Sequence, residues 1–511
     1  MVTTDDGPAT RSGVGRMMGE SEAREFALAF RSFLSWVHDD ARDARRNEVA
    51  ALVIDFLGEE RSRRSVVGRT LPGFEQVNLQ TALDAWTREP GREIATHGVM
   101  VPPHHGETPL QQIVTGEVFG PLRLSPPSLV DLPNGPGSTL ACLRRAILLV
   151  TDAHGAYAVM VTGPHEHDNA LTVEIAGLEV HEAQAVHARL DELRSALNVY
   201  RGHVLDVVPT PMGGVTLHFS DIPVTARDDV ILPEAVLARV ERHALGVADH
   251  REALLRAGQH LKRGLLLYGP PGTGKTHTTR YLVTQMTGYT RLSLTGRALG
   301  VIGAAADLAR DLQPTVIVLE DVDLVAEERS MGPGSSPVLF DLLDAMDGAA
   351  PDADLLFVLT TNRADLLEPA LAARPGRVDV AVEIDLPDAE ARRRLLTLYG
   401  RALPLELSAD ETNAVVERTD GVTASFLKEL LRRAMLECLA EGGAEPVVTA
   451  PHFSRALDDL LDANQQLTRS LLGVGNDPES LPAGGGLGLL PPQSRGRLLT
   501  RAQVRALRID P

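Results

Sequence analysis

The octapeptide GPPGTGKT at residues 269–276 matches the pattern G-x-x-x-x-G-K-[ST] at every fixed position. An apolar strand is predicted directly before it, at Gly264 to Tyr268, and a helix from Lys275 directly after it. Glycines let backbone N–H groups close around phosphates, and a helix N-terminus faces the bound anion. The segment therefore predicts a nucleotide phosphate-binding loop made of Gly269, Pro270, Pro271, Gly272, Thr273, Gly274, Lys275 and Thr276.

Two side chains at the end of this loop have separate expected roles. Lys275 is expected to reach the outer phosphates, and the Thr276 hydroxyl is expected to ligate magnesium. Only three of the 50 basic residues are lysines, namely Lys262, Lys275 and Lys428. A lysine at this place fits a site that needs a compact ammonium on a slim stem.

A second strand carries acidic residues at its carboxyl end. Thr315 to Leu319 is an apolar run that leads into Glu320-Asp321-Val322-Asp323. In open α/β sheets, ligands bind at the carboxyl ends of the strands. We expect Glu320 to hold magnesium and Asp321 to activate the attacking water. The alternative is a solvated acidic turn.

Strand-like and helical segments alternate through this half of the chain. The predicted strands are 264–268, 290–294, 315–319, 355–360 and 380–384, and helices are predicted at 389–401, 412–418, 424–441 and 451–464. Such alternation is typical of a mostly parallel sheet with helices on both faces. The later helices predict a small helical domain.

The strand at 355–360 leads into Asn362 and then into Glu368-Pro369-Ala370-Leu371-Ala372-Ala373-Arg374-Pro375-Gly376-Arg377-Val378-Asp379. This segment resembles the second region of homology of AAA ATPases. The resemblance implies that Asn362 senses the γ-phosphate and that Arg374 and Arg377 are arginine fingers for the neighbouring subunit. Gly421 to Leu427 resembles the AAA lid segment, which implies that Ala424 lies beside adenine.

The resemblance covers about Val230 to Asn464 and is that of a bacterial-type protein with a single AAA module and a distinct N-terminal domain. It implies a P-loop NTPase α/β fold with a C-terminal helical lid, preceded by an α+β N-terminal region. ATP and Mg²⁺ are the implied cofactors, with Thr276 and Glu320 on the metal and Asp321, Asn362, Arg374 and Arg377 as catalytic residues. The implied assembly is a homo-oligomeric ring, a hexamer by analogy, acting on an unknown protein client.

Two features depart from the family pattern. Most members end the acidic strand with Asp then Glu, whereas this chain has Glu320 then Asp321. Members that thread polypeptide carry an aromatic residue on the pore loop, where this chain has Val301-Ile302-Gly303. A slow ATP-dependent scaffold or switch therefore stays open beside a protein-remodelling, chaperone-like motor.

The N-terminal half contains no motif that we can assign. Helices are predicted around Phe26 to Val37 and Val49 to Leu57, a hairpin around Asp152 to Gly155, a strand at 171–175, a helix at 181–200 and a strand at 214–220. The stretch 62–136 is expected to hold only short elements. The predicted domains are a helical segment (1–65), an α+β domain for client or partner binding (66–229), the nucleotide-binding subdomain (230–388), the lid (389–464) and a flexible tail (465–511).

Bulk composition narrows the possible partners. The formal net charge of −19 argues against a broad nucleic-acid contact surface, so a DNA or RNA motor is disfavoured. No apolar run is long enough to span a membrane, and the first twenty residues have no apolar stretch typical of a secretory signal. The two cysteines, Cys142 and Cys438, lie far apart in the sequence, so it suggests neither a disulfide framework nor a zinc site. We expect a cytoplasmic protein without membrane contact.

Overall fold

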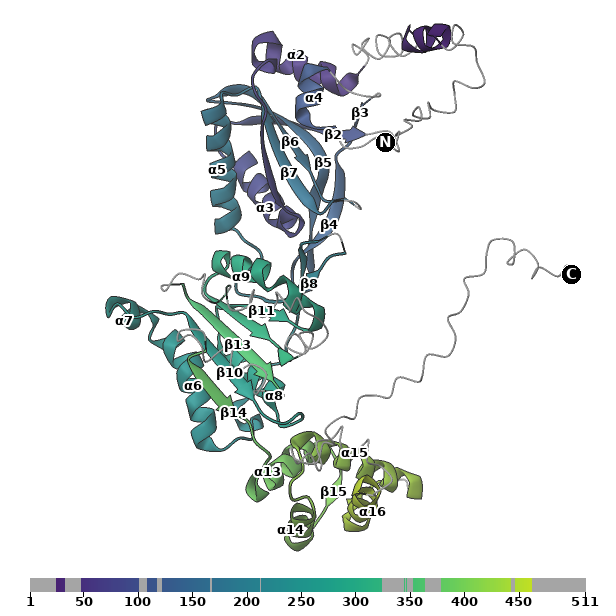
Figure 1. The fold of residues 1–511 in the computed structure, drawn as a ribbon, viewed down its shortest axis with the longest axis vertical. Helices are drawn as coiled ribbons and strands as arrows, with labels where there is room; N and C mark the ends of the chain where they lie inside the picture. The colour runs from purple at the N-terminus through teal and green to yellow at the C-terminus, as the bar shows by residue number, and fades with distance from the viewer. Residues whose placement is uncertain are drawn as a thin grey trace, which may run out of the picture. The chain divides into compact units, whose positions relative to one another are not determined.

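The structure is a computed structural model that describes residues 24–32, 47–100, 108–116, 122–165, 168–211, 213–323, 344, 346, 353–363, 378–442 and 446–461. These residues fall into two compact units (Figure 1). The first unit comprises Met1–Arg227, Ala235–Tyr268 and Thr276–Val382, and the second comprises Asp228–Glu234, Gly269–Lys275 and Glu383–Pro511. The predicted tail at 465–511 lies outside the described residues.

The first unit begins with an antiparallel sheet of seven strands. They are β1 (Val67–Pro72), β2 (Glu93–Met100), β3 (Arg123–Ser125), β4 (Ser128–Gly135), β5 (Ser138–Asp152), β6 (Gly155–Thr162) and β7 (Ala170–Ala176). Their order is β1-β7-β6-β5-β2-β3, and β4 pairs with β5. Asp152 pairs with Gly155, which leaves Ala153 and His154 as the turn and confirms the predicted hairpin.

Helices cover both faces of this sheet (Figure 1). Helices α3 (Gln76–Thr87) and α5 (Val180–Ala196) pack on the face that carries Leu148 and Val150. Helices α2 (Glu48–Ser62) and α4 (Leu110–Thr115) pack on the face that carries Ile147 and Leu149. Because both faces are buried, β5 and β6 read as nearly continuous apolar runs instead of alternating ones.

The expectation of only short elements at 62–136 was wrong. Helix α3 spans 12 residues, and β2 and β4 span eight each. Leu79, Leu83 and Trp86 recur at helical spacing and are all buried. The Pro, Gly and His residues around α3 obscured this period, although they lie mainly in the connections.

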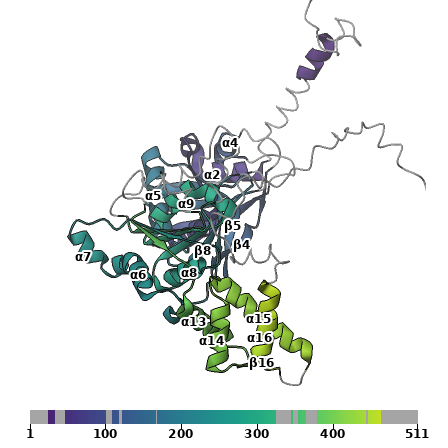
Figure 2. The same cartoon turned by 60° about the horizontal axis from the view of Figure 1, so that its bottom comes forward.

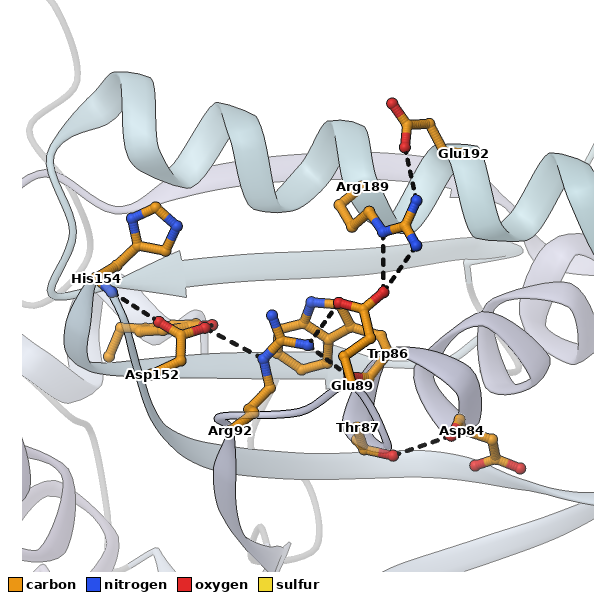
Figure 3. Close-up of polar contacts among 10 residues, drawn as sticks. Asp84, Trp86, Thr87, Glu89, Arg92, Asp152, His154, Arg189 and Glu192 are labelled. Carbon is orange, nitrogen blue, oxygen red and sulfur yellow. Dashed lines mark hydrogen bonds and ion pairs between the residues drawn. The ribbon is translucent and has the colours of Figure 1, made fainter.

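A polar network ties the end of α3 to the hairpin (Figure 3). The Arg92 guanidinium lies 4.1 Å from the centroid of the Trp86 ring, donates from Nε to Asp152 at 3.2 Å and pairs with Glu89 at 3.1 Å. Tyr157 donates to Asp152 at 2.7 Å. This network links the end of α3 to the β5–β6 hairpin by cation–π and charge-assisted contacts.

A second sheet of seven strands has the order β14-β10-β13-β12-β11-β8-β9. Its strands are β8 (Val204–Pro209), β9 (Val215–Phe219), β10 (Arg263–Tyr268), β11 (Thr290–Leu294), β12 (Thr315–Leu319), β13 (Leu355–Thr361) and β14 (Val380–Glu383). The pairs β10·β13, β13·β12, β12·β11 and β11·β8 are parallel. The helices of this part are α6 (Glu234–Asp249), α7 (Arg251–Arg256), α8 (Lys275–Gln285) and α9 (Ile302–Asp311). The α/β fold class predicted from the sequence is confirmed.

Strands β8 and β9 belong to this second sheet. The strand predicted at 214–220 is present as β9, but it pairs antiparallel with β8 and not with the N-terminal sheet. Leu205 and Val207 of β8 are buried in the same apolar cluster as Leu292 of β11. The nucleotide-binding sheet therefore includes residues that precede the predicted boundary at residue 230.

The second unit contains the predicted helices as α13 (Ala389–Gly400), α14 (Ala409–Arg418), α15 (Ala424–Glu441) and α16 (Ala450–Leu461), drawn in green to yellow in Figure 2. Strands β15 (Leu405–Glu406) and β16 (Val448–Thr449) pair beside them. Side chains of Asp388, Ser408 and Thr423 cap three of the helices. The caps at Asp388 and Thr423 agree with the starts predicted at residues 389 and 424, whereas α14 begins three residues before the predicted start at Thr412.

Asp354 is the centre of a buried ion-pair network in the first unit. It is 1% exposed and accepts from Arg263 Nη1 at 3.1 Å and from the Tyr289 hydroxyl at 2.8 Å, and it pairs with Arg251 Nε at 3.1 Å. Asp354→Asn removes the charge that compensates Arg263, so we expect the free energy of unfolding to fall by about 3–5 kcal/mol. Denaturant-induced unfolding measures this change.

The control for this prediction is Asp307→Asn, which removes an ion pair whose carboxylate is 76% exposed. The control is expected to change the free energy of unfolding by less than about 1 kcal/mol. If Asp354→Asn changed it as little, the backbone carbonyls of Leu261 and Ala244 that Arg263 also contacts would be enough to stabilise the buried guanidinium.

Candidate nucleotide-binding site

The phosphate-binding loop follows β10 and leads into α8, as predicted. Gly269, Gly272 and Gly274 have φ values of 142°, 78° and 109°, which are positive angles that L side chains rarely adopt. A Cβ on Gly269 would also lie 2.2 Å from the carbonyl oxygen of Ile384. The glycines of the loop are therefore required by its conformation.

Lys275 lies against the loop that precedes it. Its side chain is buried, and its Nζ donates to the carbonyl oxygens of Gly269 and Pro270, both at 2.8 Å. The Thr273 hydroxyl donates to Pro270 O at 2.9 Å. These bonds hold the ammonium at the loop, where its charge complements an anion.

Thr276 and Glu320 lie together in the first unit. The Thr276 hydroxyl lies close enough to the Glu320 carboxylate to lower its pKa. Burial and the neighbouring charge of Asp321 raise the pKa of Glu320, and Arg280 and Thr276 oppose this shift. A hydroxyl and a carboxylate are hard oxygen donors of the kind that Mg²⁺ prefers, so this pair fits the predicted metal site. The described residues contain no group of three or more His, Cys, Asp or Glu side chains that could hold a metal ion.

Asp321 begins the turn that follows β12. Among the described residues other than glycine, only Asp321 has a positive φ, at 52°. Its amide donates to the Thr360 hydroxyl at 3.1 Å, and its carboxylate lies 3.5 Å from Nδ2 of Asn362. Aspartate and asparagine tolerate the left-handed region better than most residues. The structure thus brings together Asp321 and Asn362, which are 41 residues apart in the sequence.

Asp323 also contributes to this cluster, although sequence reasoning gave it no role. It is 7% exposed and accepts from the Thr361 hydroxyl at 2.9 Å and from the Asn362 amide at 3.2 Å. It therefore fixes the main chain that carries Asn362. The sequence shows Asp323 as the last acidic residue of the run Glu320 to Asp323. Its contact with Asn362 depends on the pairing of β12 with β13, which the sequence does not show.

The start of α15 contacts the phosphate-binding loop within the second unit. The Ser425 amide donates to Gly272 O at 3.1 Å, and Thr423 caps the helix. A Cβ on Gly272 would lie 2.9 Å from the Ser425 hydroxyl. Ala424, which was predicted to lie beside adenine, is 7% exposed at this contact.

Three other predicted features have different outcomes. Arg374 and Arg377 lie outside the described residues. The segment Val301 to Gly303 spans the end of the 3₁₀ helix η5 (Gly296–Val301) and the start of α9. Ile302 is 1% exposed and Val301 packs against the same core. These two side chains therefore belong to the hydrophobic core.

A parallel sheet, a glycine-rich loop between β10 and α8, and acidic residues at the end of β12 define a P-loop nucleotide-binding domain. Residues 265–386 match the family model described as "ATPase family associated with various cellular activities (AAA)". The chain therefore contains an AAA ATPase domain, and ATPase activity is the general property of that family.

Several proteins are similar to this chain. The human "ATPase family gene 2 protein homolog A" is 26% identical over 476 residues, which cover 87% of this chain and 50% of the relative. "Proteasome-activating nucleotidase" of Pyrococcus horikoshii is 29% identical over 294 residues, or 54% of this chain and 72% of the relative. "ATP-dependent zinc metalloprotease FtsH" of Mycobacterium bovis is 32% identical over 218 residues, or 40% of this chain and 28% of the relative.

The chain thus spans 50% of the length of the human relative and 28% of the length of FtsH. Among the helices that the structure describes, none has the length and apolar character needed to cross a membrane.

Proposed function

We propose that this protein is a Mg²⁺-dependent ATPase that forms a homo-oligomeric ring, a hexamer, and uses ATP hydrolysis to remodel a protein client in the cytoplasm. The observation that carries the proposal is the cluster of Asp321, Asn362 and Asp323 at the carboxyl ends of β12 and β13. A carboxylate and an amide at this edge suit water activation and γ-phosphate recognition. The client is proposed to be a protein because the net charge of −19 disfavours nucleic acid.

Each residue of the site has a proposed task. Lys275 binds the outer phosphates, Asp321 accepts the proton of the attacking water, and Asn362 orients that water and the γ-phosphate. Thr276 and Glu320 would hold Mg²⁺, which neutralises charge on the phosphate oxygens. Arg374 and Arg377 would act at the site of the neighbouring subunit.

A second candidate function is a switch that binds ATP, assembles and turns over slowly. The buried side chain of Ile302 favours it, because this segment then offers no large apolar grip for a threaded peptide. The Glu320-Asp321 order also favours it, because a displaced carboxylate lowers the rate of water activation.

Lys275→Ala tests the nucleotide site on which both candidates rest. We expect ATP affinity to fall at least about tenfold and Mg²⁺-dependent turnover to be lost, because the variant lacks the ammonium that binds the outer phosphates. The control is Lys428→Ala, which alters an exposed lysine of α15. Nucleotide titration and steady-state phosphate release are the measurements. Unchanged binding in Lys275→Ala would contradict the assignment, and assembly without turnover in the wild type would favour the switch.

A further inference from the structure

A cavity of about 350 Å³ lies in the first unit beside the acidic strand. Its walls are β8, β11 and β12, the first turns of α8, and residues 220–223 after β9. Its volume falls in the range of small-molecule sites. The cavity exists because β8 and β9 extend the sheet beyond β11.

The sheet side of the cavity carries charged and polar groups in adjacent rows. In the register of the sheet, Asp206 of β8 lies opposite Ser293 of β11, and Ser293 lies opposite Val318 of β12. Two residues earlier on β11, Arg291 lies opposite Val204 of β8. Residues two apart on a strand point to the same face. Leu205 and Val207, which alternate with these residues, point into the apolar core instead. The sheet side of the cavity therefore carries the carboxylates of Asp206 and Glu320 and the guanidinium of Arg291. Helix α8 adds Arg280, whose charge offsets that of Glu320.

Two buried polar atoms of residues that line this cavity, Thr279 Oγ1 and Arg291 Nε, have no hydrogen-bond partner in the described part of the chain. Thr279 is 2% exposed, and its hydroxyl makes no hydrogen bond. Arg291 donates from Nη2 to Met286 O at 2.6 Å, but its buried Nε has no acceptor. Burial lowers the pKa of Arg291, and no carboxylate among the described residues forms an ion pair with it. Buried donors are normally satisfied, and an acceptor bound in the cavity would satisfy both atoms.

The cavity walls also carry negatively charged groups. Asp206 is half-buried and Asp221 is exposed, and neither forms an ion pair with the described residues. Val204, Val318 and Ile222 supply apolar contact between the charged groups. A ligand that matches these walls carries an anionic group, a cationic group and a small apolar part.

The geometry points to a binding site for a small zwitterion of the amino-acid or dipeptide class. Its carboxylate accepts from Arg291 and Thr279, and its ammonium pairs with Asp206. No residue of the phosphate-binding loop lines the cavity, whereas Glu320 does, and Thr279 lies one helical turn after Thr276.

The test is calorimetric titration of the full chain with four compounds that contain leucine. The probes are L-leucine, alanyl-leucine, N-acetyl-leucine, which lacks the cation, and leucinamide, which lacks the carboxylate. We expect at least one zwitterion to bind, and both blocked compounds to bind at least about tenfold more weakly. This binding is measured without ATP, so it does not depend on the proposed ATPase function.

Two variants locate the site. Thr279→Val keeps the side-chain volume and removes the unpaired hydroxyl, so the fold is expected to be kept while affinity for the zwitterion falls. Asp206→Asn is expected to lower the affinity for the zwitterion and to leave the affinity for N-acetyl-leucine unchanged. The control is Thr397→Val in α13, which removes a hydroxyl that donates to Arg393 O of the same helix. The proposal is overturned if no zwitterion binds, if the blocked compounds bind equally well, if Thr279→Val leaves affinity unchanged, or if a crystal soaked with the probes shows only water in the cavity.

Discussion

Replacing Arg374 with alanine is expected to lower steady-state ATP turnover by about 10³-fold or more, with ATP binding to the altered subunit retained. An arginine finger stabilises the charge that develops on the transferring phosphoryl group, and this contribution is of order 10³–10⁵ in rate. The guanidinium fork matches the phosphoryl oxygens in a way that a single ammonium does not. Because the finger is proposed to serve the neighbouring subunit, the loss should appear only in the assembled protein.

Mixing two inactive variants tests whether the arginine acts across the subunit boundary. Arg374→Ala subunits keep an intact phosphate-binding loop, and Lys275→Ala subunits keep an intact finger. A mixture is expected to regain part of the turnover that neither variant shows alone. The control is Arg393→Ala, which alters a guanidinium that is 42% exposed and is paired with Glu390. A mixture as inactive as its components, or an Arg374→Ala protein with wild-type turnover, would refute the assignment.

The nucleotide-binding sheet was largely predictable because its strands are short buried runs. Thr290 to Leu294 and Thr315 to Leu319 coincide with β11 and β12, and both strands lie inside a parallel sheet. In such strands the apolar run ends where the strand leaves the core, so the boundaries are visible in the sequence. The lid helices were predictable for a different reason, since Asp388 and Thr423 mark their N-termini with capping side chains.

Neighbour relations between strands were not predictable. The alternation around Val215 to Phe219 indicates a strand, but nothing local states that its partner is β8 or that β8 lies beside β11. The contact of Asp323 with Asn362 and the unpaired hydroxyl of Thr279 depend on the same relations. The sequence therefore indicated the loop and the acids, whereas the positioning of Asn362 and the cavity beside Glu320 required the strand order.

Asp321→Asn is expected to leave ATP affinity within about threefold of the wild type and to lower turnover by about 10²–10⁴-fold. Asparagine keeps the shape of the side chain but cannot accept the proton of the attacking water. It also tolerates a φ of 52°, so the turn after β12 should keep its conformation. The amide of residue 321 should still donate to Thr360, because that bond uses the main chain. Nucleotide titration and single-turnover phosphate release separate binding from chemistry.

Two further variants, Asp321→Ala and Asp307→Asn, test whether the loss of turnover is specific to the carboxylate of Asp321. Asp321→Ala loses the same base but places a residue without a polar side chain at a positive φ, so it is expected to reduce stability as well as turnover. Asp307→Asn removes a distant surface carboxylate and should change neither quantity. If Asp321→Asn retained wild-type turnover while Glu320→Gln lost it, the two acids would have the reverse of their proposed roles. Glu320 would then be the base, because burial already raises its pKa towards the range in which a carboxylate accepts protons more readily.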